Sequence, residues 1–370
     1  MTDLSDTTND ILIFKPLPDL PAPFESAGIV GWVKENLFSS KTNTLLTLLG
    51  IVFLWQTLPP LASWLIIDAT WSLSPEPCPI ENTGACWSFI VVKFRVLMFG
   101  LYPEEYLWRP ILAVVIFVLV CTATVLRLVR TRLLIILWSV LPVLLLVLIN
   151  GGMGLEPVEQ SLWGGLMLST GLASIGILMS IPLGILLAIG RRSRLILVKS
   201  ICIGLIESIR GVPLITILFM ASVMLPIFLP HGMDINNLLR VQIGIILFSS
   251  AYIAEVVRGG LQAVSKGQIE AADAIGLKQW MVTCFVVLPQ ALRHVIPSLI
   301  GRCVALFKDT SLVIIVGLLD FLGMIKASAQ DPQWLGYDAE AYVFCAFVYW
   351  VICFSMSRYG KSIEAHNQWQ

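Results

Sequence analysis

Residues 270–289, EAADAIGLKQWMVTCFVVLP, form a polar interruption between two long apolar segments. Glu270 and the two alanines after it favour the start of a helix, because an acidic side chain interacts favourably with the positive end of the helix dipole. Gly276 permits a bend in the backbone, and Pro289 is expected to end the second half of the stretch. The pattern predicts a helix, a turn and a second helix outside the bilayer, compact enough to dock in a cleft of a partner protein.

Hydrophobic residues make up 57% of the chain and charged residues 13%, and the mean hydropathy is +0.86. An ordinary soluble domain has roughly 25% charged residues, so this composition indicates a polytopic membrane protein. A membrane-crossing helix needs about 20 apolar residues. We therefore expect an all-α fold with about eight transmembrane helices, at residues 45–67, 110–129, 133–150, 161–189, 197–229 with a break inside, 239–258, 293–318 and 340–357.

The 24 basic and 24 acidic residues give no net charge, which implies neither nucleic acid nor an anionic surface as a partner. Their distribution is more informative, because basic residues mark cytoplasmic loops of membrane proteins. They gather at Arg127, Arg130 and Arg132, at Arg191, Arg192, Arg194 and Lys199, at Lys266 and Lys278, and at Arg358 and Lys361. Alternation through eight crossings then predicts that both termini and the stretch 270–289 are cytoplasmic, with loops 68–109, 151–160, 230–238 and 319–339 outside.

The beginning of the chain is polar and contains prolines, without the basic and apolar regions of a signal peptide. It is interpreted as a cytoplasmic arm, with the first crossing acting as an uncleaved signal anchor.

A turn-prone stretch, NGGMGLEPVEQ, separates three nearly pure aliphatic crossings from five that carry polar residues. The expected parts are a cytoplasmic arm at 1–44, three extra crossings at 45–150 with a periplasmic insertion at 68–109, a linker at 151–160, a core at 161–357 and a cytoplasmic tail at 358–370.

Two of the eight cysteines differ in setting from the rest. Cys78 and Cys86 flank a proline-containing segment of a predicted outside loop, where a disulfide is plausible in an oxidising periplasm. Their spacing, without histidines, is weak evidence for a metal site. The other six lie in or beside apolar segments, where packing is the usual role of a thiol.

Four signatures occur in one order along the predicted core. They are Glu207-Ser-Ile-Arg-Gly-Val-Pro-Leu, Tyr252-Ile-Ala-Glu-Val-Val-Arg-Gly-Gly, the stretch 270–289 and Phe307-Lys-Asp-Thr-Ser-Leu. The third resembles the EAA loop of ABC importer permeases, with Val286 where isoleucine is usual. Together the four resemble the five-helix permease core of the polar amino acid uptake family, the histidine/glutamine type. The extended N-terminal region is similar to one branch of that family, the general L-amino acid permeases.

The resemblance implies a bacterial inner-membrane permease subunit that imports amino acids by alternating access. It also implies partners: a dimer of ATPase subunits that binds ATP and Mg²⁺, a second permease subunit that is a different paralogue, and a periplasmic amino acid binding protein. The residues implied in coupling to the ATPase are Glu270, Ala271, Ala272, Gly276, Leu288 and Pro289. The chain itself has no Walker-type phosphate loop, and we assign it no catalytic residue, no metal and no cofactor of its own.

Charged residues inside a membrane are costly, so each must find a partner or line a water-filled path. Glu207 and Arg210 are three residues apart on one predicted helix and are able to pair with each other. The Gly-Val-Pro that follows is expected to break the helix, either as a gate in the transport path or as a structural kink. Tyr252, Glu255 and Arg258 also share one helical face, so Glu255 either binds an amino group of the cargo or neutralises Arg258.

A third polar group interrupts the predicted crossing at 293–318. Adjacent residues on a helix do not face each other, so Lys308 and Asp309 must find partners elsewhere. Thr310 and Ser311 either bond to their own backbone or present hydroxyls to the cargo. Polar breaks near the bilayer midplane are where transporters bind substrates, so these four residues are predicted to line the substrate pathway with Glu207, Arg210, Tyr252 and Glu255.

The competing hypothesis is an ion-coupled secondary amino acid transporter, which could use Glu255, Lys308 and Asp309 as a coupling site. Such transporters usually contain internal repeats. The three leading crossings do not resemble the five that follow, which favours the ATP-driven importer.

Overall fold

A computed structural model describes residues 28–72, 76, 78, 84–228, 230 and 235–367. These residues form helices and connecting loops, with no strand beyond isolated bridges in the described part. Their contacts divide the chain into one unit of residues 1–69 with 81–85 and another of residues 70–80 with 86–370. The predicted linker at 151–160 therefore lies inside the second unit, which includes two of the three leading crossings.

The first unit contains α1 (Gly28–Leu37) and α2 (Lys41–Ala62), so the predicted arm at 1–44 is helical where it is described. Ser40 caps α2, since its Oγ accepts a hydrogen bond from the amide of Asn43 at 3.1 Å. A π-helical turn, Ser63–Ile67, continues the helix. Lys41–Ile67 has the length and composition of a membrane span, in agreement with the predicted crossing at 45–67.

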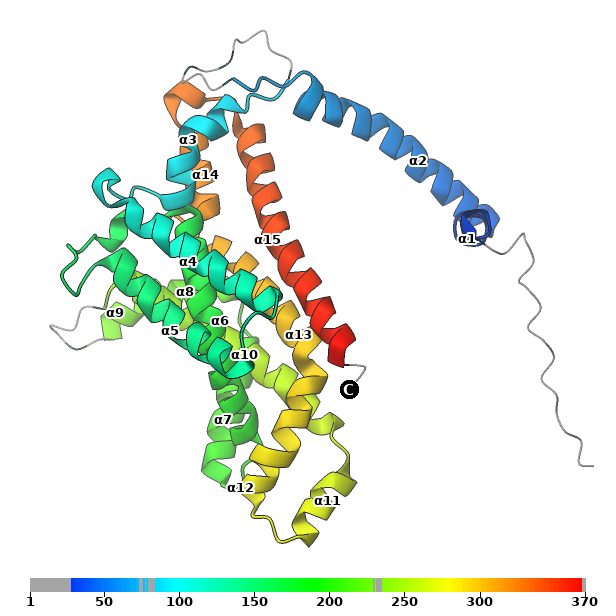
Figure 1. Cartoon of the computed structure of the whole chain (residues 1–370), viewed down its shortest axis with the longest axis vertical. Coiled ribbons are helices and arrows are strands. Elements are labelled where there is room, and N and C mark those ends of the chain that lie inside the picture. The colour runs from blue at the N-terminus through cyan, green and yellow to red at the C-terminus, as the bar shows by residue number, and fades with distance from the viewer. Residues whose placement is uncertain are drawn as a thin grey trace, which may run out of the picture. The chain divides into compact units, whose positions relative to one another are not determined.

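The second unit begins with α3 (Ser88–Phe99), α4 (Trp108–Val125) and α5 (Thr131–Asn150). The latter two run side by side in Figure 1 and pack on each other. The predicted insertion at 68–109 contains α3, which packs against α6, α14 and α15. Phe89 and Leu97 of α3 are fully buried in one cluster with Phe321 and Trp334. This stretch is therefore part of the second unit's core.

The remaining elements of the second unit follow the order of the predicted five-helix core. They are α6 (Gly165–Arg191), α7 (Ile196–Arg210), α8 (Leu214–Phe219), α9 (Leu225–Phe228), α10 (Asn237–Ala263), α11 (Lys266–Ala274), α12 (Gln279–Met281), α13 (Leu288–Asp309), α14 (Phe321–Ala329) and α15 (Asp338–Asn367). Helix α10 is central, because it packs against α6, α7, α8 and α13. Helix α15 extends through most of the predicted tail at 358–370.

Six described helices are long and apolar enough to cross a membrane, or seven if α7 and the α8–α9 segment form one span bent by 106°. Helix α13 does not meet this test, although it has 22 residues, and it carries Arg293, Arg302 and Lys308. The predicted crossing at 293–318 ends as a helix at Asp309 and continues as a 3-10 segment, Thr310–Val316. The predicted number of eight crossings is thus approximate.

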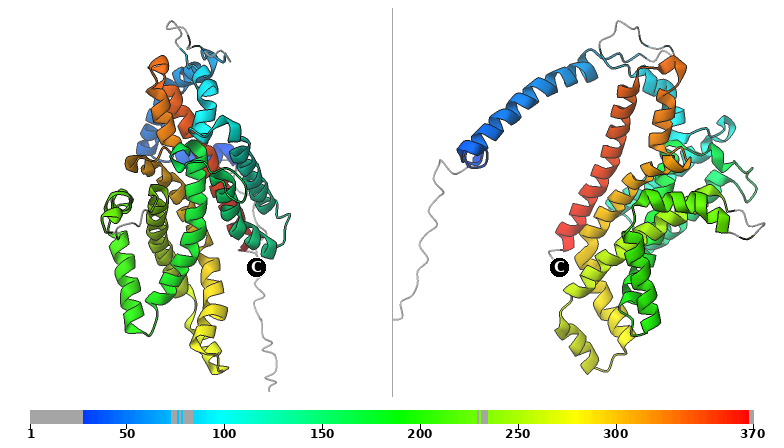
Figure 2. Two further views of the ribbon diagram at one scale, coloured as in Figure 1. Left: turned by 90° about the vertical axis from the view of Figure 1, so that its left-hand side faces the viewer. Right: turned by 180° about the vertical axis from the view of Figure 1, so that it is seen from behind.

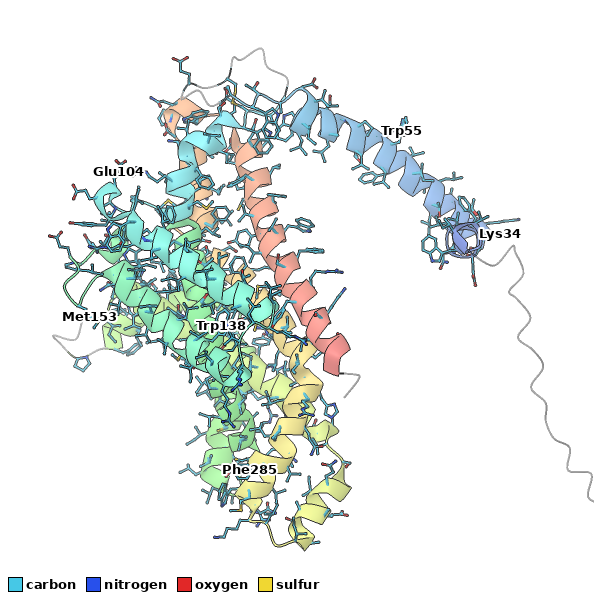
Figure 3. The ribbon with its side chains drawn as sticks, viewed as in Figure 1. Lys34, Trp55, Glu104, Trp138, Met153 and Phe285 are labelled. Carbon is cyan, nitrogen blue, oxygen red and sulfur yellow. A yellow bond between two sulfur atoms is a disulfide. The ribbon has the colours of Figure 1, made fainter. Side chains whose placement is uncertain are left out.

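The two ends of the second unit carry different elements. Figures 1 and 2 show α11 at one end and both α3 and α14 at the other. Phe285 lies at the same end as α11 (Figure 3). The stretch 270–289 is therefore separated by the length of the helices from the loops that hold Cys78 and Cys86.

Candidate functional site: a docking loop and a charged helix junction

The stretch 270–289 folds as the helix, turn and helix that its sequence predicts. Helix α11 begins at Lys266, however, so Glu270 lies in its second turn and the predicted start of the helix at Glu270 is wrong. Ser265, in extended conformation, precedes the helix and sets its beginning four residues earlier. Glu270 and Ala271 are exposed, whereas Ala272 is 5% exposed and packs under the loop.

Gly276 makes the turn possible because its φ is +77°, in the left-handed region that favours glycine. Its amide donates to the carbonyl of Asp273 at 3.0 Å, and the amide of Leu277 donates to that of Ala272 at 3.2 Å. This pair of bonds is the Schellman motif that closes helix C-termini. The glycine therefore fixes the direction in which the chain leaves α11.

Pro289 does not end the second helix, so that prediction is wrong. A π-helical turn, Val282–Val287, leads from α12 directly into α13, with Pro289 in the first turn of α13. The backbone stays in the right-handed helical region at Val287 and Leu288, so the chain does not leave the helix before Pro289. Continuous helix therefore runs from α12 through the π-helical turn into α13. The stretch 270–289 is called the docking loop below, after its predicted role.

Three large apolar side chains are exposed on this loop, which the sequence analysis did not single out. Ile275 is 77% exposed, Phe285 69% and Trp280 56%, and the rings of Trp280 and Phe285 lie 5.9 Å apart. Large apolar side chains grouped on a polar loop are typical of protein interaction sites. Ile275 lies just before the turn at Gly276, whereas Trp280 and Phe285 lie after it, so the exposure of all three on one stretch depends on how the chain turns there.

Helices α6, α7 and α10 meet at a cluster of charged residues. Arg191, the last residue of α6, donates from Nη1 to Glu207 of α7 at 2.9 Å and to Glu255 of α10 at 3.5 Å. Glu255 also pairs with Arg210 at 3.4 Å and with Arg258. The predicted pair of Glu207 with Arg210 is not formed, because each residue turns to a partner on another helix.

The helix is interrupted immediately after this cluster, as the Gly-Val-Pro sequence predicts. Helix α7 ends at Arg210, and α8 starts at Leu214 after Pro213. The amide of Gly211 still bonds to the carbonyl of Glu207 at 2.9 Å. The bend therefore lies within one turn of the charged residues.

Tyr252 of α10 is adjacent to this cluster and has two cationic neighbours. The guanidinium carbon of Arg210 lies 5.5 Å from the centre of its ring, and that of Arg302 on α13 lies 4.4 Å from it. Both distances fall within the range of cation–π attraction. Neither Arg191 nor Arg302 was predicted to belong to the site.

The polar run at residues 308–311 marks the point where α13 changes to a 3-10 helix. The hydroxyls of Thr310 and Ser311 donate to the carbonyls of Phe307 and Lys308, both at 2.8 Å. Thr310 is fully buried, whereas Lys308 is exposed and Asp309 half-buried. Of the two hypotheses for the hydroxyls, the geometry matches bonding to their own backbone.

A disulfide joins Cys78 and Cys86, with their Cα atoms 6.1 Å apart. The amide of Cys86 donates to Glu340 at 3.0 Å, and the hydroxyl of Tyr337 donates to the carbonyl of Cys78 at the same distance. The disulfide-closed loop is thereby bonded to the start of α15.

Comparison with known proteins shows the family to which the chain belongs. Residues 180–366 match the model of the family described as "binding-protein-dependent transport system inner membrane component". The amino-acid ABC transporter permease protein YhdY of Escherichia coli K12, an inner-membrane protein, is 47% identical over 94% of this chain and 95% of its own length. The chain belongs to this family of inner-membrane transport components.

Two proteins of Rhodobacter capsulatus are also similar to this chain. The permease protein BztC of a glutamate/glutamine/aspartate/asparagine transport system is 36% identical over 93% of this chain and 95% of its own length. BztB, named as a permease protein of the same system, is 37% identical over 33% of this chain and 29% of its own length.

Membership in the family identifies the chain as a permease component of an ABC importer. The family match begins inside α6 and includes the docking loop, the charged cluster and Tyr252. It excludes α3, α4 and α5. In the part of the chain that the structure describes, no group of three or more histidine, cysteine or acidic residues is suited to hold a metal ion.

Proposed function

We propose that this chain moves amino acids across the inner membrane by alternating access and that a separate ATPase subunit, with bound ATP and Mg²⁺, drives it. The observation that carries this proposal is the docking loop. It presents an exposed apolar group next to the turn at Gly276 and is continuous with α13. Movement of a partner bound to this loop would be transmitted along that helix.

The cluster of charged residues where α6, α7 and α10 meet supports a transport pathway close to the bend after Arg210. Glu207, Arg210, Tyr252 and Glu255 come from α7 and α10, and none of them is fully buried. Rocking of the helices would change the ion pairs that Arg191 makes with two of them. We include residues 308–311 in the pathway, with Lys308 as the exposed member.

The proposed partners are a dimer of ATPase subunits, a second and different permease subunit, and a periplasmic amino acid binding protein. The description of the family names binding-protein dependence. BztB and BztC carry the names of two permease proteins of one system, which supports a heteromeric permease pair. We propose that the docking loop and both chain termini face the cytoplasm, because the basic residues near them indicate that side.

Vesicles that contain the permease pair, the ATPase and the binding protein provide the test. ATP should drive amino acid uptake, and Glu270→Arg should abolish uptake and co-purification with the ATPase, because it reverses a charge on the exposed face of α11. Glu105→Arg is the matched control, since it reverses an exposed charge on the loop before α4. Uptake that follows a proton or sodium gradient without the ATPase would contradict the proposal and favour an ion-coupled transporter.

A further inference from the structure

Two guanidinium groups from different helices lie over one aromatic ring. Arg210, at the end of α7, and Arg302, in the middle of α13, are both within cation–π distance of Tyr252 on α10. Two positive charges held against the same ring repel each other, and an anion beside them relieves that repulsion. The ring attracts each cation through its face but carries no negative charge that could neutralise them.

The described protein supplies too few anions for these cations. Arg302 makes no ion pair or hydrogen bond within the described residues, and its Nε is buried without an acceptor. Arg210 shares Glu255 with Arg191 and Arg258, and its Nε is also buried without an acceptor. Four arginines, at 191, 210, 258 and 302, therefore face two glutamates, at 207 and 255, which leaves two positive charges in excess.

The nearest further acid does not correct the imbalance. Asp309 lies on the same helix as Arg302 and interacts with its charge, yet the two form no ion pair within 4.0 Å. Counting Asp309 together with the exposed Lys308 of the same helix leaves the excess of two positive charges unchanged. Within a membrane an excess of this kind requires an anionic partner.

The geometry also leaves room for such a partner. Arg210, Tyr252 and Arg302 are all partly exposed, and in each guanidinium group only Nε is buried without an acceptor. A guanidinium fork matches the two oxygens of a carboxylate, and stacking on an aromatic ring holds the fork in place. Carboxylate is a group that every amino acid carries, and acidic amino acids carry it twice.

We infer that Arg302 and Arg210, held against Tyr252, form a binding site for a carboxylate of the transported amino acid. This inference rests on the function proposed above. The carboxylate comes either from the α-carbon or from an acidic side chain. The two sources make different predictions for amino acids that differ only in the side chain, such as glutamate and glutamine.

The test is equilibrium binding of the twenty protein amino acids to the purified permease and ATPase complex without its binding protein, which would otherwise mask the affinity of the permease. Arg302→Gln removes a charge-assisted pair, so it should raise Kd at least about tenfold. A rise confined to glutamate and aspartate assigns the site to the side-chain carboxylate. A rise for every amino acid that binds assigns it to the α-carboxylate.

Arg240→Gln provides a matched control, because Arg240 also has a buried Nε without an acceptor but contacts the carbonyl of Ser222 instead of Tyr252. Arg302→Lys keeps the charge without the fork and should give an intermediate Kd. Unchanged Kd values in Arg302→Gln, or no amino acid binding by the wild type, would overturn the inference. ATP-driven uptake by the same wild-type complex would still support the proposed function, so the two can fail separately.

Discussion

Arg191 and Glu207 form an ion pair with 2.9 Å between Nη1 and Oε1 that joins the end of α6 to the last turn of α7. The same Nη1 lies 3.5 Å from Glu255, so one guanidinium links three helices. The bend after Arg210 follows within one turn. Movement of α6 would therefore reach the proposed pathway residues of both α7 and α10 through Arg191.

Arg191→Gln should lower the rate of ATP-driven uptake and slightly lower the free energy of unfolding. The variant leaves Glu207 without its cation and removes one of three cations from Glu255. Because Glu207 is 53% exposed, the loss of stability should be about 1 kcal/mol or less. Uptake in vesicles and thermal unfolding of the purified complex measure the two effects.

The neighbouring Arg194→Gln serves as control for that experiment. Arg194 is exposed and forms no ion pair in the described part of the chain. Equal uptake by the two variants would mean that the link made by Arg191 does not take part in transport.

The sequence predicted the features that local chemistry determines. The break after Arg210 follows from a proline that cannot continue a helix, and the turn at Gly276 follows from a residue that tolerates positive φ. It did not predict that Arg191 pairs with Glu207. Spacing on one helix pointed to Arg210 instead, and the choice between them depends on how α6 and α7 pack.

Helix α3 was missed for a related reason. Its twelve residues are too few to cross a bilayer, so a search for long apolar segments placed it in an outside loop. Its burial comes from contacts with α6, α14 and α15, the last two more than 200 residues later in the chain. In the sequence alone, nothing distinguishes Ile275, Trp280 and Phe285 from other apolar residues. Only the fold of the docking loop shows that no described residue covers their side chains.

Two adjacent glycines in the Tyr252–Gly260 signature should respond in opposite ways to alanine. A Cβ at Gly260 would meet the carbonyl oxygen of Ala291 and the side chain of Val295, each at 2.6 Å. Gly260→Ala should therefore push α10 from α13 and lower the free energy of unfolding by about 1–3 kcal/mol. Nothing lies within 4 Å of a Cβ at Gly259.

Gly259→Ala should be neutral or stabilising by about 1 kcal/mol, because alanine is the better helix former. Thermal unfolding of the two variants in the same detergent makes the comparison. The close contact of α10 with α13 would be refuted if Gly260→Ala were as stable as Gly259→Ala.

Removal of the disulfide should destabilise the loop before α3. Cys78 and Cys86 are separated by eight positions, and closing so short a loop stabilises a fold by about 2–3 kcal/mol in the chain-entropy estimate. Cys86→Ser should lower the midpoint of thermal unfolding, and a reductant should lower it in the wild type but not in the variant. Cys202→Ser, at a free cysteine of α7, is the control.

Thiol labelling under denaturing conditions checks the bond directly. Six of the eight cysteines should react before reduction and all eight after it. Reaction of all eight without a reductant would show that the bond does not form in the cell.

The ion pair between Lys93 of α3 and Asp331, after α14, should make stability depend on pH. Lys93 donates from Nζ to Asp331 at 2.5 Å, and this bond lowers the pKa of the Asp331 carboxyl. A carboxyl whose pKa is lower in the folded state stabilises the fold above its unfolded pKa of about 3.9, and the stabilisation is lost as pH falls through the folded pKa. Asp331→Asn should therefore be less stable than the wild type near pH 7.

Because asparagine can still accept the hydrogen bond from the amide of Gln333, the substitution tests the ion pair alone. The difference in unfolding midpoint between wild type and Asp331→Asn should shrink as pH falls from 7 to 3. Glu159→Gln, at an exposed carboxyl with no ion pair among the described residues, should show no such trend. A difference that stayed constant with pH would mean that the Lys93 contact contributes no charge-dependent stability between α3 and α14.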